Sequence, residues 1–328
     1  MMRASIIGGR GWSMTNPMDE FMEMVLNALG GGVLDRIDRR ARQGRDLRQW
    51  GLHPRLPDGG SPLAADDAAF KEAYPLALAG DAAVSEECLF PMMNASENLY
   101  AVALLAEQRS KSRDLYASSI MQLCRSAMEN SARTIWMLSG SSRTERVSRC
   151  MSVEMEQLEQ QSYFLKLDAE FEQSGRNPRP QNLIDDNNAH REKHAALREE
   201  LKAEYTYAKP LSFTKTIGEA ARWVDQHVPT HDTGELREHG LEQGARSFYS
   251  YGSSFVHGYS WMSDYARGGV LFGMVADGLA AALHMTECAV CLYEAACRAP
   301  GGQRAADSHV PERLEPTIAA WSEELFSE

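Results

Sequence analysis

Residues 270–292, VLFGMVADGLAAALHMTECAVCL, form the most apolar stretch of the chain. Asp277, His284 and Glu287 interrupt this stretch with ionisable side chains. A membrane-spanning helix needs roughly 20 predominantly apolar residues, and charged side chains within such a span are rare. The stretch therefore predicts a helix that is buried in a protein core, and we expect no membrane partner.

The rest of the chain has the composition of a helical protein. Among 328 residues there are only 13 Val and 8 Ile, and strands are built largely from such β-branched residues. Apolar periodicity, helix caps and helix breaks predict an all-α fold, a helical bundle. Its first helix is expected to start at Pro17 and to end at the run Gly30–Gly31–Gly32. The later helices are expected at residues 33–50, 63–79, 84–110, 113–138, 143–173, 181–207, 214–227, 234–263, 269–298 and 312–326.

Composition also divides the chain into regions. Residues 51–62 are rich in Pro and Gly, which predicts a linker between an N-terminal helical appendage, residues 1–50, and a helical bundle domain, residues 63–328. Within this domain, residues of about 143–207 alternate in charge and have few apolar positions. They predict a polar helical hairpin that projects from the more apolar bundle.

The charge balance excludes one broad class of function. Lys and Arg number 34 and Asp and Glu 46, so the formal net charge is −12, which argues against a general coating of nucleic acid or of anionic membranes. A local basic site stays open, because six arginines lie between Arg36 and Arg48. They form either a phosphate-binding patch or, as is more usual for a run of charges, a solvated helix face.

Cysteine usage and the first residues indicate the compartment. The six cysteines are dispersed through apolar helical segments, unlike the disulfide framework of a small secreted protein. The N-terminal residues MMRASIIGGRGWSMTNP lack the apolar segment of a signal peptide. We therefore expect a reduced protein in the cytoplasm.

A charged stripe accompanies the helix expected at 113–138. Arg125, Glu129 and Arg133 are spaced i, i+4, i+8 and share one side of this helix, beside its apolar face. They form either local ion pairs at the surface or a stripe that neighbouring helices bury. A buried charge needs a partner, and such pairs cluster at functional sites.

A second polar set lies on the helix expected at 234–263. Arg246, Ser250, Ser253 and His257 share one helix face, since eleven steps of 100° return to within about 20° of the start. Gly252 lies on the same helix and costs roughly 1 kcal/mol in a helix interior, which indicates close approach of another helix or of a ligand. His257 is either a ligand-facing residue or a core histidine that a hydroxyl or carbonyl satisfies.

These two segments resemble a known superfamily. The stretch RSAMEN, residues 125–130, is followed by Trp136 on the next helix turns. The later segment has Arg246, Tyr249, Ser253 and the run Val256–His257–Gly258. Over about residues 95–298 the chain resembles uncharacterised bacterial helical proteins of the HEPN superfamily. This resemblance implies a metal-independent ribonuclease that works as a homodimer, with an Arg followed four to six residues later by His.

The spacing of the candidate residues departs from that motif. Ten residues separate Arg246 from His257, which places them about 16 Å apart along one helix axis. Arg222 and His227 do have the motif spacing, but five steps of 100° place them about 140° apart around their helix. We take that second match as coincidence.

The resemblance implies an RNA-directed effector, a ribonuclease or toxin in defence or stress response. RNA cleavage needs a base for the ribose 2′-hydroxyl proton, a cation for the charged phosphorane and an acid for the leaving oxygen. His257 would serve as acid or base, Arg246 or Arg125 would bind the phosphate, and Glu129 would orient a partner. Ser253 completes this candidate site, which calls for RNA as partner and for no cofactor and no metal.

Two alternatives stay open. In the first, the bundle is a non-catalytic module for protein–protein interaction or dimerisation, with the hairpin at 143–207 as its surface. In the second, His190 and His194 bind a divalent ion, because their i, i+4 spacing places them on one helix face. The segment HREKH is not HExxH, however, since Glu192 lies about 200° around the helix from His190. The chain contains no glycine-rich nucleotide motif of the GxGxxG or GxxxxGK[ST] type.

Overall fold

The computed structural model describes residues 17–77, 80–112, 114–176, 178–265 and 270–326, without the side chains of residues 17–31 and 110. Within these ranges the chain is all-α and contains no strand, as predicted. Residues 1–16 of the predicted appendage lie outside the described part. The helices are α1 (Pro17–Leu52), α2 (Pro62–Ala73), α3 (Ala83–Ser112), α4 (Ala117–Leu138), α5 (Arg143–Gln173), α6 (Gln181–Glu204), α7 (Phe213–Gln226), α8 (Glu235–His239), α9 (Glu242–His257), α10 (Met262–Tyr265), α11 (Val270–Cys297) and α12 (Glu315–Leu325), with a 3₁₀ turn η1 (Glu312–Leu314) before α12.

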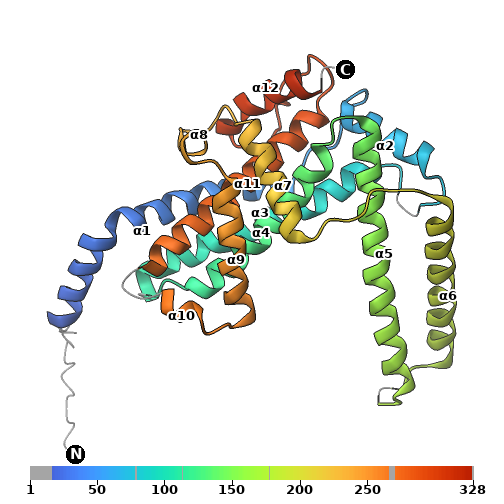
Figure 1. Cartoon of the computed structure of the whole chain (residues 1–328), viewed down its shortest axis with the longest axis horizontal. Helices are drawn as coiled ribbons and strands as arrows, with labels where there is room; N and C mark the ends of the chain where they lie inside the picture. Colours follow the sequence, from blue (N-terminus) through green and yellow to red (C-terminus); the bar gives the residue numbers. More distant parts are fainter. Residues whose placement is uncertain (1–16, 78–79, 113, 177, 266–269, 327–328) are drawn as a thin grey trace, which may run out of the picture.

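The apolar stretch at residues 270–292 lies in the central helix, α11. It contacts α1, α3 and α4 along its length, while α7, α9 and α12 cover its other sides (Figure 1). From Gly278 to Cys297 its side chains are buried, apart from the partly buried His284. Among the described helices, α11 is the one long and apolar enough to cross a membrane by length and composition. However, 89% of its most apolar window lies inside the fold, as in a core helix, so this is weak evidence for a membrane span.

The first helix is longer than predicted. We expected a break at Gly30–Gly31–Gly32, but α1 continues through this run to Leu52. Glycine lowers helix propensity by roughly 1 kcal/mol per residue, yet unlike proline it keeps every backbone hydrogen bond of the helix. Beyond the glycines, Ile37, Leu47 and Trp50 are buried in the same hydrophobic core as α3 and α11. The prediction of a separate appendage up to residue 50, with a linker at 51–62, stays a prediction.

The helix predicted at 234–263 is divided in three, which corrects our expectation of one continuous element. Gly240 ends α8 and Gly258 ends α9, both with a positive φ, at 68° and 66°. Glycine adopts this left-handed conformation without steric cost. The start of α9 is capped from α7, because Asp225 accepts the backbone N–H groups of Leu241 at 2.5 Å and Glu242 at 3.0 Å.

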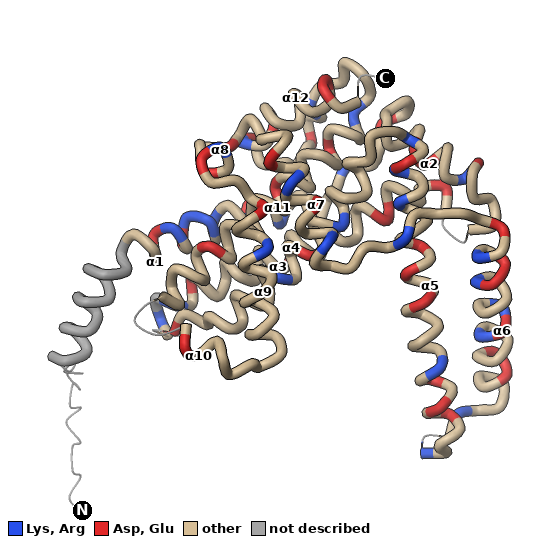
Figure 2. Tube along the Cα trace, in the orientation of Figure 1, with Lys and Arg blue, Asp and Glu red and all other residues tan. Residues whose placement is uncertain are grey.

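The predicted hairpin is formed by α5 and α6. Figure 1 shows the two helices side by side, projecting well beyond the other helices. The root of α5 is fixed by Arg146, which donates two hydrogen bonds to the buried Asp66, at 2.5 and 2.9 Å. Charges of both signs alternate along both helices (Figure 2). The structure therefore places most of this segment outside the core that the other helices share.

Candidate functional site

The predicted charged stripe on α4 forms a contact with α9. Arg125 donates from Nε to Glu129 at 2.8 Å, one turn further along α4. Its Nη2 donates to the hydroxyl of Tyr249 at 3.1 Å, and the guanidinium lies 4.5 Å from the centre of the Tyr249 ring. Apolar residues on the adjoining side of α4, such as Cys124 and Met128, are fully buried and hold this face against the body. Arg125 and Glu129 are therefore brought together as predicted, with Tyr249 as an additional partner.

Arg125 is charged, and one of its N–H donor groups finds no acceptor among the described residues. Burial disfavours its charged form, but the hydrogen bond and negative charge of Glu129 outweigh burial and raise the pKa of Arg125. Its Nη1 is buried and finds no hydrogen-bond acceptor among the described residues. A buried N–H group without an acceptor costs free energy, and a bound anion would supply the missing acceptor.

Arg246 lies away from this contact. Its side chain is 62% exposed and pairs with Glu242 at 3.4 Å, near the start of α9. Glu242 also binds Arg222, at 2.7 Å. His227, the other half of the second motif match, stacks on the Trp223 ring at 4.4 Å. The structure thus gives neither arginine a contact with a histidine.

His257 lies at the opposite end of α9. It is the last residue of that helix, it is exposed, and its ring lies 5.6 Å from the ring of Tyr259. Ser253 is partly buried one turn earlier. The helix rise separates Arg246 from His257 by about 16 Å, so these predicted site residues do not gather around one point.

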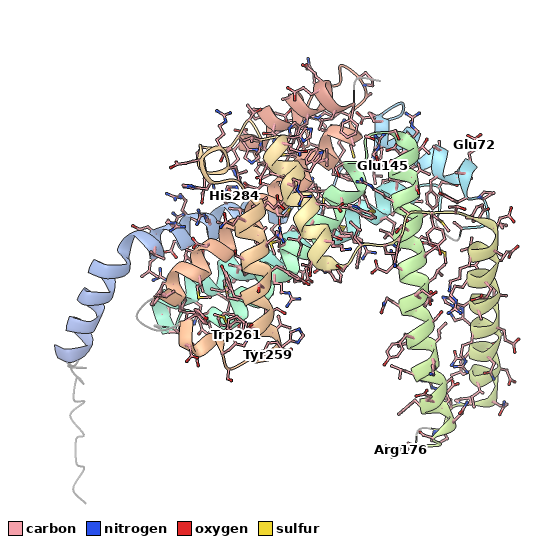
Figure 3. The ribbon with its side chains drawn as sticks, in the orientation of Figure 1. Glu72, Glu145, Arg176, Tyr259, Trp261 and His284 are labelled. Atoms are coloured by element: carbon pink, nitrogen blue, oxygen red, sulfur yellow. The ribbon has the colours of Figure 1, made fainter. Side chains whose placement is uncertain are left out.

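An exposed aromatic edge lies beside His257, and it was not anticipated from the sequence. Tyr259, Trp261 and Tyr265 are 55%, 45% and 63% exposed, although aromatic side chains are usually buried at least in part. Trp261 and Tyr265 contact each other edge to face, with ring centres 5.7 Å apart. Figure 3 shows Tyr259 and Trp261 at the same edge of the body, away from the α5–α6 hairpin. The signal was present in the sequence as four aromatic residues within residues 255–265.

The histidine pair on α6 has no third ligand among the residues that the structure describes. The rings of His190 and His194 lie 6.4 Å apart. His194 is buried, and burial, followed by the nearby charges of His190 and Arg198, lowers its pKa. Among the described residues, no three His, Cys, Asp or Glu side chains are grouped as metal ligands. His194 packs instead at the contact between α6 and α5.

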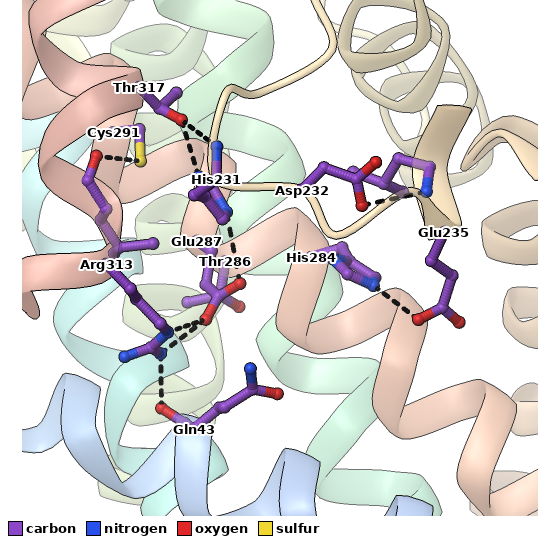
Figure 4. Close-up of polar contacts among 12 residues, drawn as sticks. Gln43, His231, Asp232, Glu235, His284, Thr286, Glu287, Cys291, Arg313 and Thr317 are labelled. Atoms are coloured by element: carbon purple, nitrogen blue, oxygen red, sulfur yellow. Dashed lines mark hydrogen bonds and ion pairs between the residues drawn. The ribbon is translucent and has the colours of Figure 1, made fainter. Parts of the chain in front are cut away.

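A buried polar network lies on α11, again unanticipated from sequence (Figure 4). Glu287 accepts two hydrogen bonds from Arg313, at 2.6 and 3.2 Å, and lies 3.5 Å from Nε2 of His231. The Thr317 hydroxyl accepts the backbone N–H of His231 and lies 2.8 Å from its Nδ1. Thr317 is fully buried, so the network ties α11 to α12 within the fold.

A second polar pair links α8 to α11 beside this network. Glu235 lies 3.5 Å from Nε2 of His284 and also binds Arg40 of α1. The hydrogen bond from His284, followed by that from Arg40, lowers the pKa of Glu235 to about 2. Asp277, the third polar residue of the apolar stretch, pairs with Arg36 at 2.7 Å. All three ionisable residues that interrupt the stretch are therefore paired.

The arginine run on α1 is largely neutralised by carboxylates. Arg36 and Arg40 bind Asp277 and Glu235, as described above. Arg45 binds Glu107, and Arg48 lies 3.5 Å from Glu97, so α3 supplies both of these carboxylates. Figure 2 shows this basic segment running beside acidic residues of its neighbours. The pairing favours a packed helix face over a phosphate-binding patch.

The hairpin carries an apolar surface that its polar composition concealed. Phe164, Leu167 and Phe171 of α5 are 65%, 45% and 46% exposed. Their spacing of i, i+3 and i+7 places them on one side of the helix. We call these three residues the α5 stripe. Tyr163 of the same helix and Leu183 of α6 are also exposed, at 63% and 47%.

The α5–α6 contact itself depends on charged side chains. Asp168 and Glu172 of α5 bind both Arg179, which precedes α6, and Arg191 of α6. The distances lie between 2.6 and 3.4 Å. Leu158 and Leu201 are the deeply buried apolar residues at the base of the hairpin. These ion pairs join the two helices through side chains other than those of the α5 stripe.

A groove of about 240 Å³ lies between α4, α5 and α7. Trp136, Arg149 and Trp223 are among its lining residues. Arg149 is already bonded, to Glu145 and to backbone and hydroxyl oxygens near Trp136. None of the site residues predicted from sequence lines this groove.

Comparison with known proteins gives no assignment. No protein-family model matches the chain, and no curated protein and no solved structure is significantly similar to it.

Proposed function

We propose that the protein is a helical interaction module whose α5–α6 hairpin docks a helix of another protein. The observation that supports this function is the α5 stripe: three large apolar side chains on one side of a projecting helix, 45–65% exposed. Contiguous exposed apolar residues on a folded protein mark binding surfaces, and Phe and Tyr are enriched in interface cores.

The location of the stripe suits such a role. α6 covers one side of α5 through its polar contacts, and the stripe lies on another side. A helix that packs into a groove presents anchors at i, i+3 or i+4 and i+7, and a complementary seam has the same spacing. One further helix would complete the packing of α5.

Site-specific photocross-linking in the native host tests this function. A photoreactive phenylalanine analogue at Leu167 should cross-link to one defined protein. The same analogue at Gln173, which is exposed and lies outside the stripe, should not. Phe164→Ser combined with Phe171→Ser should abolish the cross-link while leaving the circular dichroism spectrum unchanged. Equal cross-linking from positions 167 and 173 contradicts the proposal.

An RNA-directed effector of the HEPN type is the second candidate, and the aromatic edge beside His257 favours it. Unpaired bases of single-stranded RNA stack on exposed aromatic side chains, and Tyr259, Trp261 and Tyr265 offer such a surface. Histidine titrates near neutral pH and is suited to proton transfer. Ser253 precedes His257 by one turn on the same helix, and a homodimer, as the resemblance implies, would be the route by which a second chain supplies an arginine.

Ribonuclease measurements distinguish this candidate from the first. The purified protein should cleave single-stranded RNA in the presence of a chelator, and its expression should arrest growth. His257→Ala should remove both effects, and Tyr259→Ala should weaken RNA binding. Full activity in His257→Ala eliminates His257 as the acid or base. The stripe substitutions serve as the matched control, because they lie on the distant hairpin.

A further inference from the structure

The α5 stripe has the geometry of a coiled-coil seam. Phe164, Leu167 and Phe171 alternate in steps of three and four, as the a and d positions of a heptad do. Leu158 points to the other side of α5 and is 3% exposed. α5 is therefore apolar on two sides, of which one is already covered.

The hairpin is acidic around this seam. Residues 154–204 contain 12 Asp or Glu and 7 Lys or Arg, which gives a formal net charge of −5. Four of the seven cations are used internally, whereas Arg176 and Lys193 are exposed and form no ion pair with any described residue. Among the four, Arg179 and Arg191 bind Asp168 and Glu172. Arg198 and Lys202 of α6 likewise reach carboxylates of the hairpin. The negative charge that remains is available to a partner.

Several carboxylates face solvent without a cation. Asp186, Glu192 and Glu200 of α6 are exposed and form no ion pair with any described residue. Glu170 is adjacent in sequence to Phe171 of the stripe and has a side chain that is 58% exposed. It reaches one cation, Lys166, at 4.0 Å, the limit of an ion pair. Such a surface attracts a basic partner and repels an acidic one.

The same charges argue against a second copy of this chain on the stripe. The whole chain has a formal net charge of −12, and two hairpins packed through their stripes would bring two charges of −5 together. Like charges opposed across an interface cost free energy and select against that pairing.

We propose that the α5 stripe binds an amphipathic helix of a partner protein whose apolar seam is flanked by Lys or Arg. This inference rests on the proposed docking function and specifies the chemistry of its partner. The apolar seam supplies contact area, and the basic flanks supply complementarity to the acidic hairpin.

Synthetic peptides test the inference with the full-length protein. Two fluorescent peptides of about three heptads share Leu at a and d, and carry either Lys or Glu at e and g. By anisotropy, the Lys-flanked peptide should bind at least ~10-fold more tightly than the Glu-flanked one, and the difference should shrink as salt is raised. Phe164→Ser with Phe171→Ser should abolish binding, whereas Gln173→Ser should leave it unchanged.

The possible outcomes distinguish failure of this inference from failure of the proposed docking function on which it rests. If both peptides bind equally and the stripe substitutions abolish the binding of both, the docking function is supported and the proposal of a basic partner is wrong. If the stripe substitutions change nothing, or neither peptide binds, the inference fails together with the stripe as its site. If sedimentation shows a dimer of the chain that the stripe substitutions dissociate, the occupant is a second copy and the inference is overturned.

Discussion

The carboxylate of Glu287 and the guanidinium of Arg313 form a hydrogen-bonded ion pair, with Oε1 and Nη2 separated by 2.6 Å. Glu287 is 3% exposed and lies in the middle of the most apolar helix. Burial favours its neutral form, but the hydrogen bond with His231 and the charge of Arg313 outweigh burial and lower the pKa of Glu287. Arg313 also donates to the Gln43 carbonyl at 3.0 Å, so one side chain joins α1, α11 and the turn before α12.

Removing Arg313 should destabilise the protein strongly. Arg313→Ala leaves a buried carboxylate without its cation, and loss of one partner of a buried pair typically costs about 3–5 kcal/mol. Urea unfolding followed by circular dichroism measures the change. Arg222→Ala, which breaks the exposed pair with Glu242, is the control and should cost no more than about 1 kcal/mol. Adding Glu287→Leu to Arg313→Ala should restore part of the lost stability, and no recovery would contradict this explanation.

Glu235 should make stability depend on acid pH. Its pKa is lowered from 4.5 to about 2 in the folded state, mainly by the hydrogen bond with His284. A carboxylate with a lowered pKa stabilises the fold fully above its unfolded pKa, and this contribution is lost as the pH falls from about 4.5 to 2. The urea midpoint should therefore fall across this window less steeply in Glu235→Gln than in the wild type. Glu238→Gln, at a residue whose side chain is 76% exposed, should leave the slope unchanged.

Two glycines of α11 should respond in opposite directions to alanine. A Cβ atom at Gly278 would lie 2.7 Å from the Phe248 ring, which is fully buried and cannot move aside. Gly278→Ala should therefore destabilise the protein by about 1–3 kcal/mol through overpacking. A Cβ at Gly273 meets no atom within 4 Å, so Gly273→Ala should be neutral or stabilising by up to about 1 kcal/mol. Equal effects in thermal unfolding would disprove the close approach.

The cysteines should be unreactive in the folded protein. All six are buried free thiols, and burial raises the pKa of each one. The thiolate is the reactive form, so a thiol reagent should label none of them under native conditions. All six should react once the protein is unfolded in guanidinium. Rapid labelling of any thiol in the native protein would show that its helix opens.

Local signals in the sequence were sufficient for several of the long helices, such as α4 and α5, but not for α1, which continues through its predicted break. The bounds predicted for α5, about 143–173, match those observed. At its start the local signals are clear in the structure, since Ser142 caps the first turn and Glu145 accepts from Ser141. The pair of Arg125 and Glu129 was predictable for the same reason, since helix spacing alone brings them together. Such features depend on neighbours in sequence and require no knowledge of the fold.

Features that depend on tertiary contacts were not predictable. Gly240 and Gly258 are local signals for the division of residues 234–263, but the cap that Asp225 of α7 gives to α9 joins segments that no spacing rule connects. Phe248 explains the glycines at both 252 and 278, whereas the sequence indicated a close approach only at Gly252 and did not identify its origin. The partner Tyr249 and the network around Glu287 likewise join segments far apart in the chain. The α5 stripe was missed because composition averages over the polar residues beside it.

The two ends of the hairpin meet at its root. The backbone N–H of Ala208, just after α6, donates to the Ser148 hydroxyl near the start of α5, at 3.1 Å. The chain therefore leaves the body at the start of α5 and returns to it after α6 at the same place. A heptad added to or removed from both helices would change the reach of the hairpin by about 10 Å and leave its anchorage intact. The length of the hairpin, and with it the position of its binding surface, can thus vary without any change in the helices that anchor it.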